Sequence, residues 1–136
     1  MKQWILFLLP VVFLFSGCAK GDKFKETIYI SSNSMTFSSK ASSDSVYSMG
    51  DGFSDVYIYA NRLKSEPDGM TMVVTSNEIN WIKVIARRKE ADGPYYMLVV
   101  EVSKNDTGQE RTTELSLLPL SIPTSHDAKV YVTQEP

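Results

Sequence analysis

The chain has 136 residues, a formal net charge of −2 and 22% charged residues. This length and mixed composition fit one globular domain, and the slightly acidic balance argues against a nucleic-acid partner, which needs a basic surface. With one cysteine and one histidine, the chain has no cysteine pair for a disulfide, and a histidine-based metal site would need carboxylate partners.

The first element along the chain is an apolar N-terminal segment. Lys2 supplies a positive charge, and Trp4–Phe15 follows without a charged or polar side chain. As a helix rising about 1.5 Å per residue, this run would extend roughly 18 Å, which is too short for a hydrocarbon core of about 30 Å. The pattern therefore predicts a signal peptide rather than a membrane-spanning helix.

The apolar segment ends in Phe15-Ser16-Gly17-Cys18. Small residues before a cleavage site suit a signal-cleaving protease, and the run resembles the bacterial lipobox, in which the cysteine is acylated and becomes the new N-terminus. The resemblance implies a signal peptide over residues 1–17 and a lipid, such as palmitate, on Cys18 that anchors the protein to a membrane. Cleavage removes 17 of the 136 residues, leaving 119, and the loss of Lys2 takes the net charge from −2 to −3.

The rest of the chain divides into a tether and a series of short strands. Residues 18–26 are polar and charged without periodicity, as in a tether. Polar, turn-forming stretches are predicted as loops at Ser38–Gly52, Asn61–Gly69 and Arg87–Pro94. Alternating runs predict strands at Thr27–Ile30, Ser34–Phe37, Phe53–Ala60, Met70–Thr75, Asn80–Ile85, Tyr95–Ser103, Arg111–Leu118 and Ala128–Gln134.

The alternation also assigns side chains to the two faces of each strand. Tyr96 is placed on the inner face with Leu98, Val100 and Val102, which leaves Tyr95 facing outward. Seven or eight such strands in one domain over residues 27–136 predict an all-β fold, an immunoglobulin-like antiparallel β-sandwich.

The C-terminal half carries a series of motifs that is similar to a known family. Trp81-Ile82-Lys83-Val84 is followed by Asp92-Gly93, the strand Leu98–Val102, Asn105 to Arg111, and a final Val130-Tyr131-Val132-Thr133-Gln134. This order resembles the BACON domain, an immunoglobulin-like module of Bacteroidetes cell-envelope proteins. The resemblance implies an outer-membrane location, on the periplasmic or the outer face, and a carbohydrate-related role.

The motif residues have structural interpretations that need no ligand. We expect Trp81 to pack between the sheets, and Asn105 and Gly108 to form a turn with positive φ. Arg111 is expected to bind loop carbonyls or to pair with Glu101 or Glu110.

Residue types that could serve catalysis or metal binding lack a suitable arrangement. Ser125-His126-Asp127 are consecutive, so on an extended chain their side chains point to alternate sides and cannot form a triad. Asp44, Asp51 and Asp55 do not follow a calcium-loop pattern and are interpreted as solvated carboxylates. We therefore expect a protein that is not an enzyme and has no cofactor or metal.

Two sequence features suggest binding or modification. Tyr57, Tyr59, Tyr95 and Tyr131 are predicted to face outward, where they would either stack on sugar rings or form cross-strand aromatic pairs that stabilise the sheet. Asp44-Ser45-Val46 is similar to the Asp-Ser/Thr-aliphatic acceptor of O-glycosylation in Bacteroidetes envelope proteins, with Ser45 as the acceptor in a loop.

Two functions remain open at this point. The first is a lipid-anchored accessory module that binds a glycan or an envelope protein, and the second is a structural or spacer lipoprotein without a small-molecule ligand. A fold alone does not decide between them.

Overall fold

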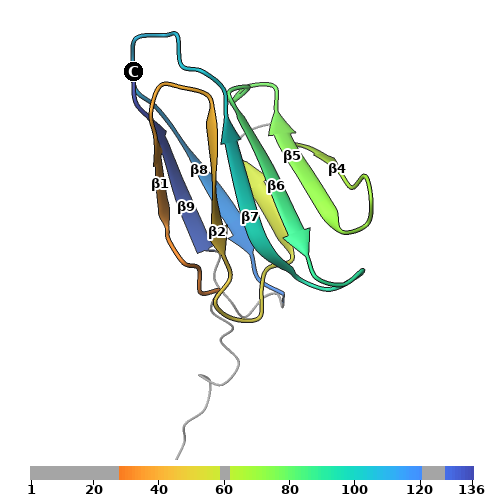
Figure 1. The fold of residues 1–136 in the computed structure, drawn as a ribbon. Helices are drawn as coiled ribbons and strands as arrows, with labels where there is room; N and C mark the ends of the chain where they lie inside the picture. The colour runs from red at the N-terminus through yellow and green to blue at the C-terminus, as the bar shows by residue number, and fades with distance from the viewer. Residues whose placement is uncertain (1–27, 59–61, 121–127) are drawn as a thin grey trace, which may run out of the picture.

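The computed structural model describes residues 28–58, 62–120 and 128–136 and shows two β-sheets packed face to face (Figure 1). The four-stranded sheet has the order β1-β9-β8-β3, and the five-stranded sheet has the order β2-β7-β6-β5-β4. The strands are β1 (Ser34–Phe37), β2 (Ser42–Tyr47), β3 (Asp55–Ile58), β4 (Arg62–Ser65), β5 (Thr71–Ser76), β6 (Ile82–Arg88), β7 (Tyr95–Val102), β8 (Arg111–Leu118) and β9 (Ala128–Gln134). The predicted all-β sandwich is confirmed. Over these three ranges no helix is long and apolar enough to cross a membrane.

The core lies between the two sheets and is made by alternate residues of the long strands. Leu115 and Leu117 of β8 and Val130 and Val132 of β9 are completely buried, as their alternation predicted. From the opposite sheet, Met72, Val74, Val84, Leu98 and Val100 are equally buried. Each such side chain contributes about 1.5–3 kcal/mol to folding by leaving water, so the sandwich can be stable without a disulfide.

Two strands form in segments that were predicted to be loops. Residues 42–47 form β2, which pairs antiparallel with β7, and residues 62–65 form β4, which pairs antiparallel with β5. Both lie at edges of the five-stranded sheet, and each has at most one buried side chain. Both strands are held by backbone hydrogen bonds to a neighbouring strand. Alternation of apolar and polar residues does not predict such bonds.

The N-terminal strands also differ from prediction. Thr27–Ile30 was predicted to be a strand, but over its described part only Ile30 pairs, in a single bridge to Ser48. Strand β1 pairs with β9 in the parallel direction, from Ser34 opposite Tyr131 to Phe37 opposite Gln134. The four-stranded sheet therefore combines parallel and antiparallel pairing at this edge. In the described ranges the structure has nine strands, where seven or eight were predicted.

A bulge at the start of β7 reverses the predicted faces of two tyrosines. Arg87 pairs with Met97, but the next residue, Arg88, pairs with Tyr95, so Tyr96 has no partner in β6. An extra residue in one strand turns the preceding side chain to the other face. Tyr95 is consequently buried, at 4% exposure, and stacks on Phe53 with ring centres 5.9 Å apart. The prediction that Tyr95 faces outward is wrong.

Candidate ligand-binding groove

A groove of about 410 Å³ lies at one end of the five-stranded sheet. It is formed where β5 ends, β6 begins and β7 ends, and Figure 1 shows these three strand ends together at the end of the sandwich that also carries the C-terminus. The groove is lined by Thr75, Ser76, Asn77, Asn80, Trp81, Ile82, Lys83, Glu101, Val102 and Ser103. An aromatic ring, two amides and an ion pair thus share one concave surface, a combination typical of sites for polar small ligands.

Trp81 is half-buried and lies at the edge of the core, not fully between the two sheets. Its indole contacts the buried cluster, and the guanidinium carbon of Arg111 lies 4.7 Å from the ring centre. A guanidinium over an aromatic face is held by the ring quadrupole. Trp81 therefore packs against the core, as expected, but it is only partly buried and also lines the groove.

Arg111 is fixed by hydrogen bonds to loop carbonyls. This was one of the two roles predicted for it, the other being an ion pair with Glu101 or Glu110. Its Nη2 donates to the backbone oxygens of Ser103 and Lys104 at 3.0 and 3.1 Å. Its Nε donates to Oε1 of Gln134 at 2.8 Å. Partial burial lowers the pKa of Arg111, while Asp106 opposes that change. Glu101, one of the predicted carboxylate partners, pairs instead with Lys83 at 3.6 Å.

Gln134 connects three segments beneath the groove. Its side chain is completely buried, and Nε2 donates to the backbone oxygens of Ser103 at 2.8 Å and Ser38 at 3.1 Å. A buried amide is stable only when its donors and acceptor are satisfied, and Arg111 and these carbonyls satisfy both. The sequence analysis treated Gln134 only as the end of a motif, since a polar residue at an inward position gives no sign of its partners.

Asn105 braces the loop between β7 and β8, but not in the predicted manner. Gly108 has the expected positive φ of 73°, whereas Asn105 is buried and has no positive φ. Its Nδ2 donates to the backbone oxygens of Gln109 and Glu135 at 2.8 and 2.9 Å, and its Oδ1 accepts from Thr107. Asn105 is therefore an internal brace of the loop.

Ser76 shapes the turn that carries the amide side chains of Asn77 and Asn80. Ser76 is buried, and its Oγ accepts from the backbone N–H groups of Glu78 and Ile79 at 3.2 and 3.3 Å. Local bonds of this kind fix a turn without further partners. Asn77 and Asn80 lie on this turn and are exposed, so their amides reach the groove from a defined backbone.

The four tyrosines proposed from the sequence do not form one surface. Tyr57 and Tyr131 are exposed, at 40% and 50%, and both belong to the four-stranded sheet. Tyr57 lies opposite Ser116 and Tyr131 opposite Glu114, so the two rings stand on the same face of this sheet, separated by β8 and offset by two residues along it. The guanidinium of Arg62 covers Tyr57 at 3.9 Å. Tyr95 is buried, and Tyr59 lies outside the described residues.

A second, larger hollow of about 680 Å³ includes Tyr131. Two charged side chains in its lining, Lys129 and Glu114, pair with each other at 2.8 Å. Tyr131 is its one aromatic lining residue among those described. The Trp81 groove offers a larger ring together with exposed amides, and is the better candidate for a binding site.

The remaining predicted sites are changed or lie outside the described residues. Ser45 stands in β2 opposite Val99 rather than in a loop, and its backbone N–H bonds to Asp44, so the expected loop setting of the acceptor is wrong. Asp55 is not solvated, because it pairs with Arg62 at 2.7 Å. Within the described ranges no three acidic, histidine or cysteine side chains gather as a metal-binding group. Cys18 and Ser125-His126-Asp127 lie outside those ranges.

Comparisons with known proteins give one structural likeness. No family model and no curated protein matches the chain. A solved structure, a Bacteroides ovatus GH5 xyloglucanase in complex with a XXXG heptasaccharide, is similar with a TM-score of 0.47 and 18% sequence identity. The alignment covers 79% of this chain and 18% of that chain, so it spans less than a fifth of the xyloglucanase.

Proposed function

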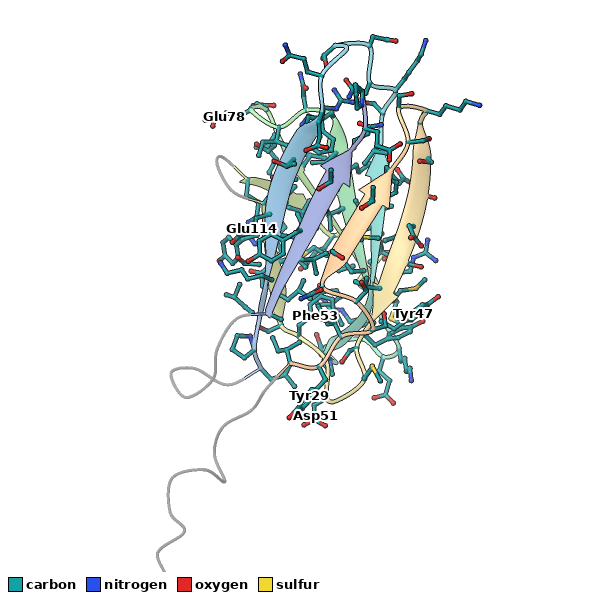
Figure 2. The ribbon with its side chains drawn as sticks, turned by 90° about the vertical axis from the view of Figure 1, so that its left-hand side faces the viewer. Tyr29, Tyr47, Asp51, Phe53, Glu78 and Glu114 are labelled. Atoms are coloured by element: carbon teal, nitrogen blue, oxygen red, sulfur yellow. The ribbon has the colours of Figure 1, made fainter. Side chains whose placement is uncertain are left out.

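We propose that this protein is a non-catalytic, lipid-anchored cell-envelope module that binds a glycan in the Trp81 groove. The observation that supports the proposal most directly is the position of the groove. Figure 2 places Glu78, on the turn beside the groove, at the opposite end of the sandwich from Tyr29, which stands next to the first described residue. A module anchored through Cys18 would thus hold the groove away from the membrane.

The chemistry of the groove favours a carbohydrate over an apolar ligand. Sugars offer hydroxyl groups that bond to amides and charged side chains, together with C–H faces that rest against aromatic rings. Asn77 and Asn80 supply amides, Lys83 and Glu101 supply charges, and Trp81 supplies the ring. The network of Arg111 and Gln134 holds the ring and the neighbouring backbone in place before a ligand arrives, which reduces the entropy lost on binding.

Binding can be measured through Trp81 itself. The sequence has two tryptophans, Trp4 and Trp81, so in a chain without residues 1–17 the tryptophan fluorescence, excited selectively over tyrosine, comes from Trp81 alone. The experiment is a glycan array with the chain from residue 19 onward, followed by fluorescence titration of each positive polysaccharide. The proposal expects saturable quenching or a shift of emission. It also expects N80A and K83A to weaken binding at least tenfold, while Y131A, on the other sheet, leaves it unchanged.

Two outcomes would replace this proposal. If no glycan binds but an envelope protein is captured through the same groove variants, the partner is a protein. If neither binds and N80A and K83A have no effect in cells, the chain is a structural or spacer lipoprotein. The anchor has its own test, in which Cys18→Ala should move the protein from the membrane fraction to the soluble fraction without unfolding it.

A further inference from the structure

Three large apolar side chains are exposed at the end of the sandwich opposite the groove. Tyr29 is 61% exposed, Tyr47 46% and Met49 71%. Figure 2 shows Tyr29 and Tyr47 together at this end. We call these three residues the basal patch.

The basal patch is one continuous surface. Ile30 and Ser48 form an antiparallel bridge, and the N–H of Met49 donates to the carbonyl of Tyr29 at 2.7 Å, so Tyr29 and Met49 are directly opposite each other. Tyr47 and Met49 are two residues apart and therefore share a face of their extended segment. Tyr47 also pairs with Met97, which is half-buried.

The core at this end is closed without help from the patch. Phe53 and Tyr95 are buried and stacked on each other, and Val46, which precedes Tyr47, is buried as well. Single exposed apolar residues are common, but several on neighbouring backbone positions at one end of a small domain are typical of an interaction surface.

We propose that the basal patch rests on the interfacial region of the lipid bilayer that holds the anchor. This inference depends on the acylation of Cys18. Ten residue steps separate Cys18 from Ile28, and an extended chain covers at most about 3.6 Å per residue, so the patch stays within about 36 Å of the bilayer. Because the tether holds the patch close to the bilayer, its contact with lipid is an intramolecular step at high effective concentration. Weak apolar contacts are then sufficient to keep the patch on the bilayer.

The composition of the patch fits the bilayer interface better than it fits anionic lipid headgroups. Tyrosine is enriched at the membrane–water boundary, where its ring enters the apolar side and its hydroxyl stays hydrated. The nearby charged side chains are mixed in sign, with Asp51, Lys89 and Glu90 lining a hollow beside Gly50. Contact should therefore occur on uncharged phosphatidylcholine and change little with salt, unlike the adhesion of a basic surface.

The test uses the acylated protein reconstituted in phosphatidylcholine vesicles. Acylation occupies the one native cysteine, so M49C carries a single free thiol for a polarity-sensitive fluorophore. D106C, on an exposed loop at the groove end, is the matched control. We expect blue-shifted emission at position 49 and at least twofold stronger quenching by lipid-borne quenchers than at position 106. Adding Y29S and Y47S to M49C should abolish the shift.

The possible failures are distinguishable. If the protein remains in the membrane fraction but the labels at positions 49 and 106 report the same aqueous environment, the bilayer contact is wrong and the lipid anchor stands. A shift at position 49 that grows with the protein-to-lipid ratio means that a second copy covers the patch, which also overturns the inference. A protein absent from the membrane fraction overturns both the anchor and the bilayer contact.

Discussion

The guanidinium of Arg111 lies over the ring of Trp81, with 4.7 Å between the guanidinium carbon and the ring centre. The same guanidinium bonds to the carbonyls of Ser103 and Lys104. One side chain of the four-stranded sheet thereby fixes an aromatic ring next to the start of β6, in the other sheet, together with the loop that joins β7 to β8. The geometry of the groove consequently depends on a residue that does not line it.

The first prediction concerns this contact. Arg111→Lys keeps the charge but loses the planar fork that bonds several acceptors at once. We expect the emission of Trp81 to shift to longer wavelength and the free energy of unfolding to fall by about 1–3 kcal/mol. Both are measured during urea denaturation of the chain from residue 19 onward. Arg87→Lys, at an exposed position of β6, is the control and should change neither quantity.

The second prediction concerns the buried amide of Gln134. Gln134→Leu keeps the approximate volume but leaves Nε of Arg111 and the carbonyl of Ser103 without this partner. The free energy of unfolding should fall by about 1–3 kcal/mol for the polar groups left unsatisfied. Gln109→Leu makes the same chemical change at an exposed position and should cost less than about 0.5 kcal/mol. Equal effects of the two substitutions in chemical denaturation would contradict the role given to Gln134.

The third prediction compares two glycines with positive φ. Gly52 has φ of 99°, and a Cβ added there would lie 2.5 Å from the carbonyl oxygen of Tyr95. Gly69 has φ of 74°, and an added Cβ would meet no atom within 4 Å. Both alanine variants carry backbone strain of about 1–3 kcal/mol, and only Gly52→Ala adds a clash with backbone. Its melting temperature should therefore fall clearly further than that of Gly69→Ala.

The fourth prediction concerns pH and the β4–β5 hairpin. A hydrogen bond from the backbone N–H of Met70, joined by bonds from Thr71, lowers the pKa of Asp68, while desolvation opposes the change. Because the folded-state pKa lies below the unfolded one, the stabilisation is complete above the unfolded value. It is lost as the pH falls through the folded value.

The measurement for Asp68 is a carboxyl-carbon NMR titration combined with hydrogen exchange of the hairpin amides. The midpoint should lie below the ordinary aspartate value of about 3.9, and the amide of Thr71 should lose protection, relative to its intrinsic exchange rate at each pH, as Asp68 becomes protonated. Asp68→Asn should remove that pH dependence. A midpoint at or above the ordinary value would show that these bonds do not form in solution.

Sequence alternation predicts the parts of this fold in which one face of a strand is buried. Strands β8 and β9 are examples, since Leu115, Leu117, Val130 and Val132 alternate with outward residues and are completely buried in the core. The same signal fails for β2, whose one buried residue is Val46. An edge strand is selected by the unpaired backbone groups of its neighbour, and that information lies in β7 rather than in residues 42–47.

The candidate groove was less predictable than the fold. Trp81 stands out in the sequence as a large aromatic residue, but its half-burial depends on Arg111 and Gln134, which arrive from β8 and β9. Tyr95 shows the converse case, because the bulge at Tyr96, which has no partner in β6, turned a predicted surface aromatic into a core residue. The exposure of Trp81 and Tyr95 is decided by long-range pairing and by a local bulge. The periodicity of a single strand carries no information about either.

The position of β9 has a consequence for how the chain matures. This strand follows the other eight along the chain, yet it lies inside its sheet, between β1 and β8. Until β9 has been delivered, β1 has no strand partner in that sheet and the buried faces of β8 and β3 remain half-covered. The native sandwich therefore cannot close before residues 128–134 are available, and until then the apolar faces of its neighbouring strands stay open to chaperones and proteases.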